Sequence, residues 1–209
     1  MVEPAQQQEA QEDVDANFIE TPAILDKHKA AGEVTNAALK KAISLCVVNG
    51  DIHTICVTVD KFMEDELKKV FSNKKSKKLE RGIAFPCCIT VNHLCGHYSP
   101  LPDESSQLNE GDVAKIDLGC HIDGYATQAT HTIVISEGKV NGKKADVILA
   151  AHHAHQAALR CIKEMGTNTS VTESIQKISE EFKVNPVEGV LSHKLKKHLI
   201  DGNDVIINK

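Results

Sequence analysis

The sequence contains no tryptophan, and aromatic residues make up only 3% of its 209 positions. So few rings argue against a stacking platform for single-stranded nucleic acid. The opening residues, MVEPAQQQEAQEDVD, are polar and acidic and do not form a secretory signal. No apolar run approaches the roughly 18 consecutive residues that a membrane-spanning helix needs. These absences predict a protein of the cytoplasm or nucleus that does not insert into membranes.

The chain also lacks the patterns of a disulfide framework or a structural zinc site. Its seven cysteines are an odd number without a secretory signal, which indicates reduced thiols. Cys87 and Cys88 are adjacent, but no paired CxxC spacing is present. His152, His153 and His155 fall on a predicted helix, where their spacing does not place all three on one face. The sequence therefore predicts no metal and no cofactor.

The residues that are present divide the chain into a tail and a globular region. Hydrophobic residues make up 41% of the sequence, which is enough for a core. Residues 1–20 are acidic and rich in glutamine, and are expected to form a flexible tail. Apolar residues at steps of three and four predict helices over 23–48 and 57–71. Further along, similar content predicts helices over 143–165 and 171–182, the last capped by Thr169, Ser170 or Thr172.

Residues 83–135 alternate short apolar runs with turn residues, which is typical of strands. The runs VAKIDLGCHI and YATQATHTIVI flank an Asp-Gly pair, which predicts a two-residue hairpin because both central positions need positive φ. With helices before and after the strands, the predicted fold class is α+β. The register that places Ile122 opposite Tyr125 sets Asp117, Gly119, Gln128 and Thr130 on one face of the hairpin.

The chemistry of this face depends on two diagonal neighbours, Asp117 and Gln128, whose backbones lie about 7 to 8 Å apart in such a hairpin. Two carboxylates at these positions would suit a pair of divalent metals. A two-metal hydrolase needs several anionic oxygens to offset about four positive charges. Compared with two carboxylates, one carboxylate and one neutral amide supply less negative charge and one fewer group that can bridge two metals.

The stretch GIAFPCCITVNHLCGHYSPLPDESSQLNEGDVAKIDLGCHIDGYATQATHTIVI resembles the strand-rich part of the methionine aminopeptidase, or pita-bread, fold. In active members of that family, one aspartate in a KIDxG motif and a second one eleven residues later bridge two metals. Asp117 matches the first position, and Gln128 stands at the second. His97 matches the substrate-side histidine, and His193 matches a metal-ligand histidine in a changed context. The resemblance implies that these four residues are the remnant of a metal pocket and that no catalytic residues remain.

The segments HIDGYATQATHTIVI and EGVLSHKLKKHLIDGNDVII are more similar to the proliferation-associated, ErbB-binding branch, which lacks peptidase activity. That resemblance implies a pita-bread domain over 21–209 that is incomplete at its C-terminal side, comprising the first half of the fold and the start of the second. It also implies a non-catalytic binding protein that associates with ribosomes, structured RNA and growth-regulating or transcriptional proteins. Cytoplasm, nucleus and nucleolus are the expected locations.

Positive charge is concentrated in residues 74–81, although the net charge of the chain is −5. A polyanion would therefore need a local patch, because the whole chain does not attract it. Lysines on one loop can contact phosphates without reading sequence, and the alternative is a solvated loop with no ligand. The residues of this predicted RNA-binding segment are Lys74, Lys75, Lys77, Lys78 and Arg81.

Two other interpretations compete with that of a binding protein. The first is a metal-dependent methionine aminopeptidase, which would require that Gln128 be tolerated and that the missing ligands be supplied. A fragment of a longer protein would expose apolar sheet surface, and could aggregate or dimerise. Release of methionine from a peptide would separate the first of these from a binding protein.

Overall fold

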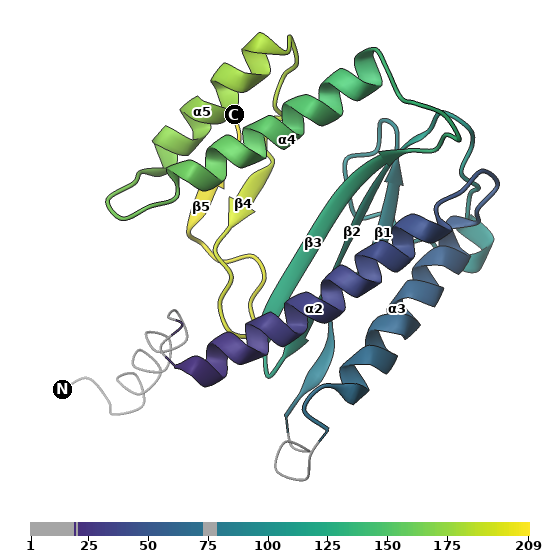
Figure 1. Ribbon diagram of the computed structural model, residues 1–209, viewed down its shortest axis with the longest axis vertical. Helices are drawn as coiled ribbons and strands as arrows, with labels where there is room; N and C mark the ends of the chain where they lie inside the picture. Colours follow the sequence, from purple (N-terminus) through teal and green to yellow (C-terminus); the bar gives the residue numbers. More distant parts are fainter. Residues whose placement is uncertain (1–18, 20, 73–78) are drawn as a thin grey trace. The chain divides into compact units, whose positions relative to one another are not determined.

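A computed structural model describes residue 19 and residues 21–72 and 79–209. The chain divides into two compact units, one of residues 1–136 with 195–200, the other of residues 137–194 with 201–209. Figure 1 shows the helices and strands of both. Within the described ranges, no helix is long and apolar enough to cross a membrane. Whether residues 21–209 act as one domain stays a prediction, and the predicted tail lies outside the described residues except for Ile19.

Two helices open the first unit. α2 (Pro22–Leu45) begins after Thr21, whose hydroxyl accepts a hydrogen bond from the Ile24 amide at 3.4 Å. Proline suits the first helical position because its missing N–H would have no partner there. α3 (Ile52–Lys69) begins five residues earlier than the predicted 57, because Asp51 caps it by accepting the Thr54 amide at 2.8 Å.

A three-stranded antiparallel sheet in the order β1-β2-β3 follows these helices. Its strands are β1 (Arg81–Val91), β2 (Val113–Ile122) and β3 (Tyr125–Val134). The predicted hairpin register is confirmed, with Ile122 opposite Tyr125. Both turn residues have positive φ, 56° at Asp123 and 78° at Gly124, as a two-residue turn of this kind requires.

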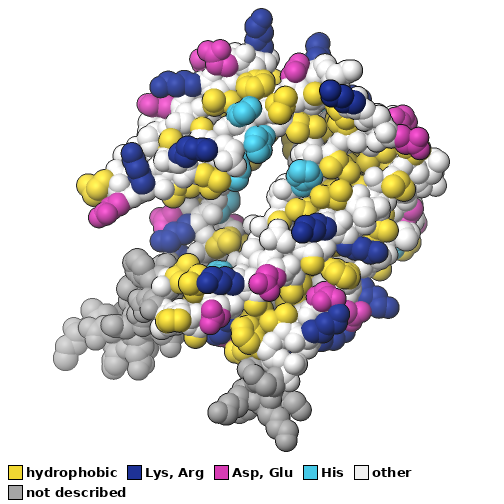
Figure 2. Space-filling model, in the orientation of Figure 1, with side chains coloured by type: hydrophobic (Ala, Val, Ile, Leu, Met, Phe, Trp, Pro, Cys, Tyr) yellow, Lys and Arg dark blue, Asp and Glu magenta, His cyan; other side chains and the backbone are white. Residues whose placement is uncertain are grey.

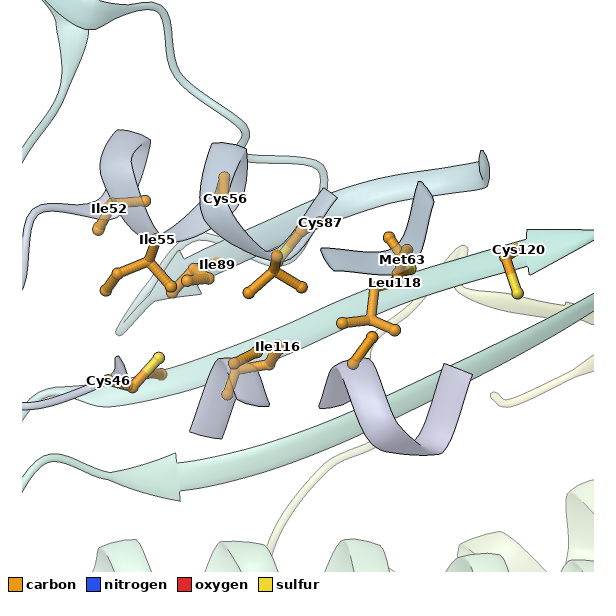
Figure 3. Packing of buried hydrophobic residues seen from close by; sticks show 14 of the residues in the cluster. Cys46, Ile52, Ile55, Cys56, Met63, Cys87, Ile89, Ile116, Leu118 and Cys120 are labelled. Carbon is orange, nitrogen blue, oxygen red and sulfur yellow. The ribbon is translucent and has the colours of Figure 1, made fainter. Parts of the chain in front are cut away.

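The core of the first unit lies between one face of the sheet and the two helices. α2 packs on β2 and β3, and α3 packs on β1. Figure 3 shows side chains from both helices meeting those of the strands. All seven cysteines are free thiols, and several of them lie in this core. Fully buried members include Ile52, Met63, Cys87, Ile89, Ile116, Leu118 and Cys120.

The second unit contains α4 (Lys143–Cys161), α5 (Asn168–Glu181) and a pair of short antiparallel strands, β4 (Leu191–His193) and β5 (Val205–Ile207). The predicted caps of α5 are wrong, because Thr167 caps it and accepts the Ser170 amide at 3.2 Å. The sequence analysis also missed β4 and β5, which are too short to show a periodic pattern. Apolar side chains are exposed on α4 and directly after it (Figure 2). Leu149 and Leu159 lie on the helix, and Ile162 follows its last residue.

Candidate functional site

The candidate site is the face of the hairpin that points away from α2 and α3. The register sets Asp117 opposite Thr130 and Gly119 opposite Gln128, so Asp117 and Gln128 are diagonal neighbours as predicted. The Thr130 hydroxyl donates a hydrogen bond to the Asp117 carboxylate at 3.2 Å. Asp117 is half-buried, whereas Gln128 and Thr130 are exposed. The carboxylate is therefore held in place beside a neutral amide.

Strand β1 adds two residues to this site that the sequence analysis missed. Cys88 lies opposite Asp117 and Phe85 lies opposite Gly119. Irregular pairing on either side of Phe85 shifts the strand, so simple alternation along the sequence does not reveal which side chains reach this site. Burial, with a smaller contribution from neighbouring negative groups that include Asp117, raises the pKa of the Cys88 thiol to about 11. The thiol is thus protonated at neutral pH.

The loop from β1 to β2 carries His97 and is fixed by several hydrogen bonds. The Ile89 amide donates to the Tyr98 carbonyl at 2.9 Å, and the Tyr98 hydroxyl donates to the Glu104 carbonyl at 2.9 Å. His97 is exposed, with φ of 65°, and its ring centre lies 5.6 Å from that of Phe85. It influences Asp117 electrostatically, so these two members of the predicted pocket lie on the same side of the sheet.

The electrostatics of Asp117 are governed mainly by burial, which raises the pKa of its carboxyl. The Thr130 hydrogen bond and the His97 charge oppose this shift without overcoming it. An acid with a raised pKa in the folded state retains its proton to higher pH than in the unfolded chain. Its ionisation therefore reduces stability as pH rises above the ordinary aspartate value of about 3.9.

We therefore expect Asp117→Asn to be more stable than the wild type at pH 7 and to lose that advantage below about pH 4, where an ordinary aspartate is protonated. The amide oxygen can still accept from Thr130. Urea unfolding at a series of pH values measures the difference. Asp103→Asn, an exposed change in the neighbouring loop, is the control and should show no such trend. A constant difference between wild type and Asp117→Asn at all pH values would contradict the effect of burial.

The residues present on this face do not fit a two-metal centre. Of Asp117, Gly119, Gln128 and Thr130, only Asp117 has a carboxylate. In the part of the chain that the structure describes, no group of three or more His, Cys, Asp or Glu side chains could hold a metal ion. A bridging role needs an anionic oxygen that the Gln128 amide cannot supply. No metal-dependent step follows from this arrangement.

The other predicted site residues belong to other segments of the chain. His193 is on β4 in the second unit, where its Nδ1 is 3.0 Å from the Gly202 carbonyl oxygen. Arg81 is the first residue of β1, is half-buried and donates to the Phe71 carbonyl at 3.4 Å. The remaining members of the RNA-binding segment, Lys74, Lys75, Lys77 and Lys78, lie outside the described residues. Their predicted role stays a prediction.

Two curated relatives resemble most of this chain. It is 46% identical to ErbB-3 binding protein 1 of Arabidopsis thaliana over 188 residues, which cover 90% of the chain and 48% of that protein. It is 48% identical to proliferation-associated protein A of Dictyostelium discoideum over 194 residues, covering 91% of the chain and 50% of that protein. The chain thus spans about half the length of these relatives.

Among solved structures, a thermophilic Arx1 superposes with a TM-score of 0.81 at 26% identity, covering 90% of this chain and 56% of that one. The predicted α+β pita-bread fold is confirmed by this likeness together with the family match. The sequence profile of metallopeptidase family M24 matches residues 26–201. The chain therefore belongs to metallopeptidase family M24, and within it resembles the ErbB-3 binding and proliferation-associated proteins.

Proposed function

We propose that this chain is a non-catalytic binding protein of family M24 that contacts ribosomal RNA or ribosomal proteins. It acts in the regulation of growth, translation or transcription, in the cytoplasm and the nucleus or nucleolus. Two relatives are named for an association, one with ErbB-3 and one with proliferation. Their names support a role in binding for this chain, which matches about half of each.

One observation carries the non-catalytic part of the proposal. Gln128 stands opposite Gly119, diagonal to the half-buried Asp117, at the position where a two-metal peptidase needs a second carboxylate. An amide brings no charge and does not bridge two cations. Burial already disfavours the charged form of Asp117, so this face of the hairpin supplies little negative charge to offset that of a dication.

The alternative function is a metal-dependent methionine aminopeptidase, because the chain belongs to a metallopeptidase family. Calorimetric titration with Mn²⁺ or Co²⁺ distinguishes the two functions. We expect no uptake of two ions by the wild type and tighter binding of at least one ion by Gln128→Asp, which restores a second carboxylate beside Asp117. The control is Gln128→Glu, which adds the same charge on a longer side chain.

Ribosome binding at two salt concentrations, in the same preparation, tests the rest of the proposal. Neutralising Lys74, Lys75, Lys77 and Lys78 should lower the salt slope by about 0.7 to 0.9 for each phosphate that the variant no longer neutralises. An unchanged affinity and slope would remove the lysine segment from the interface. Tight uptake of two metals with release of methionine from a short peptide, abolished in Asp117→Ala, would establish the peptidase instead.

A further inference from the structure

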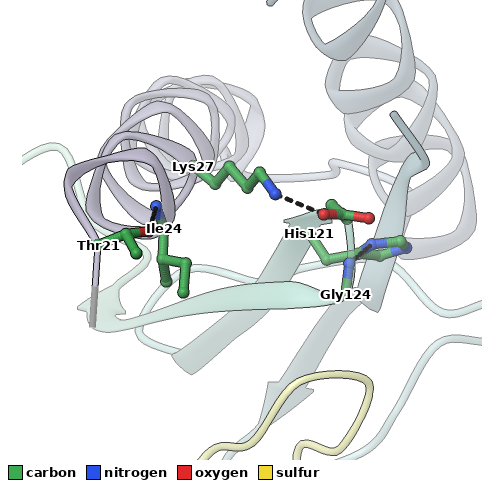
Figure 4. A network of polar contacts seen from close by, with 6 residues as sticks. Thr21, Ile24, Lys27, His121 and Gly124 are labelled. Carbon is green, nitrogen blue, oxygen red and sulfur yellow. Dashed lines mark hydrogen bonds and ion pairs between the residues drawn. The ribbon is translucent and has the colours of Figure 1, made fainter. Parts of the chain in front are cut away.

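A carboxylate helps to link each helix of the first unit to the sheet. Lys27 on α2 forms an ion pair with Asp123 in the hairpin turn at 2.5 Å (Figure 4). On α3 the link is of another kind, because the Asp60 carboxylate accepts a hydrogen bond from the backbone amide of Cys87 in β1 at 2.8 Å. The main chain of β1 is therefore held against α3 at residue 87.

An irregularity in β1 leaves the Cys87 amide available for this contact. Phe85 lies opposite Gly119 and Cys88 lies opposite Asp117, so two residues of β1 stand against one residue of β2. Such a bulge takes the extra residue out of the ladder of hydrogen bonds and redirects the side chains beside it. Cys88 lies on the polar face with Asp117, whereas Cys87 belongs to the core cluster that packs against α3.

A second cysteine meets Cys87 in the core. Cys56 lies one turn before Asp60 on α3, so both side chains are on the same face of the helix. The thiols of Cys56 and Cys87 hydrogen-bond to each other, and their side chains are 2% and 0% exposed. Figure 3 shows both among the side chains of the core. Two cysteines that already touch across packed elements need little backbone movement to form a disulfide.

The two thiols differ in how readily they ionise. The hydrogen bond with Cys87 lowers the pKa of Cys56 against the effect of burial, and a hydrogen bond with the Ser99 hydroxyl adds to this lowering. The same contact between the thiols, together with burial, raises the pKa of Cys87. Ser99 is exposed, so a small oxidant in solvent can approach Cys56 from this side. Cys56 is thus the better nucleophile of the pair.

We propose that Cys56 and Cys87 are a redox site that forms a reversible disulfide on reaction with hydrogen peroxide. The Cys56 thiolate attacks one peroxide oxygen, the O–O bond breaks, and the departing hydroxide takes up the thiol proton as water. Cys87 then attacks the sulfur of the Cys56 sulfenic acid and displaces its hydroxyl, which leaves with the Cys87 proton as a second water. One peroxide is reduced and two thiols are oxidised. A dithiol reverses the step by exchange and is itself oxidised.

The disulfide would join α3 to β1 covalently beside the Asp60 hydrogen bond. It closes residues 57–86 into a loop, which restricts the unfolded chain more than the folded one. The equilibrium constant for unfolding should therefore be lower in the oxidised chain than in the reduced chain, by about 30-fold or more. A reducing compartment keeps such a pair as thiols and allows its oxidation only transiently, as redox-sensing pairs require.

The test treats the reduced full chain with hydrogen peroxide, blocks the remaining thiols with iodoacetamide and maps the peptides without reductant. We expect a cross-linked pair of peptides that contain Cys56 and Cys87, lighter by two hydrogen atoms than the two free peptides together. Dithiothreitol should separate them. Cys56→Ala and Cys87→Ala should each abolish the cross-link, and urea unfolding of these variants should no longer respond to peroxide.

Cys88→Ala is the matched control, because it removes the adjacent buried thiol on the other face of the sheet and should leave the cross-link intact. Cys46→Ala should also leave it intact, although Cys46 is near enough to influence both thiols. The proposal is overturned if peroxide oxidises the exposed Cys95 while Cys56 and Cys87 stay reduced, or if either of them pairs with Cys46 instead. Mapping of the wild type decides this even if a core variant fails to fold.

Discussion

Leu118→Ala is expected to lower the free energy of unfolding of the first unit by about 2 to 5 kcal/mol. Leu118 is completely buried on β2, and it lies with Met63 and Ile116 in the core between the sheet and the helices (Figure 3). Truncation removes buried apolar surface and leaves a cavity that the two packed helices cannot easily close. Urea unfolding followed by circular dichroism measures the decrease.

The control for this prediction is the same substitution where the side chain is exposed. Leu101 is 63% exposed, and Leu101→Ala should change the free energy of unfolding by no more than about 0.5 kcal/mol. Equal decreases at both positions would mean that the packing around Leu118 does not contribute as described.

Gly119→Ala should lower the free energy of unfolding by about 1 to 3 kcal/mol, although it adds only a methyl group. A Cβ at this position would lie 2.6 Å from the Thr127 carbonyl oxygen and 2.9 Å from Gln128 Cγ. The first neighbour is backbone of the paired strand and cannot rotate away. The hairpin must therefore distort beside Asp117. The same urea titration, with amide chemical shifts of β2 and β3, measures the stability and locates the distortion.

Gly96 provides the matched control, because a Cβ there would have no atom within 4 Å. Gly96→Ala should leave both the stability and the shifts of the hairpin nearly unchanged. If Gly119→Ala behaves in the same way, then the close approach of β3 to Gly119 is not a constraint on the fold.

Local signals in the sequence predict the hairpin well. The Asp-Gly turn and the alternation of the flanking runs set the register, so the juxtaposition of Asp117, Gly119, Gln128 and Thr130 follows from counting residues. The helices were also predicted, with errors at their ends. The start of α3 depends on a single capping side chain, Asp51, which also accepts a hydrogen bond from the Ser105 hydroxyl at 2.7 Å.

What the sequence could not predict depends on contacts between distant segments. Cys88 and Phe85 reach the polar face because β1 is irregular around Phe85, and no periodic pattern encodes such an irregularity. Tyr125 is contacted by Lys27 and by Lys197, which are far from it and from each other along the chain. Contacts of this kind have no local sequence motif, since neither the spacing of residues nor composition reveals a tertiary contact.

The segment 195–200 has a consequence for the order of folding. It leaves the second unit, contacts the hairpin turn through His198 and Lys197, and returns to the second unit at Asp201. Closing so long a loop costs chain entropy before its few contacts form, whereas the two-residue turn of the hairpin closes locally. We therefore expect the segment to dock onto a hairpin that has already formed, so that the contacts of His198 and Lys197 form late in folding.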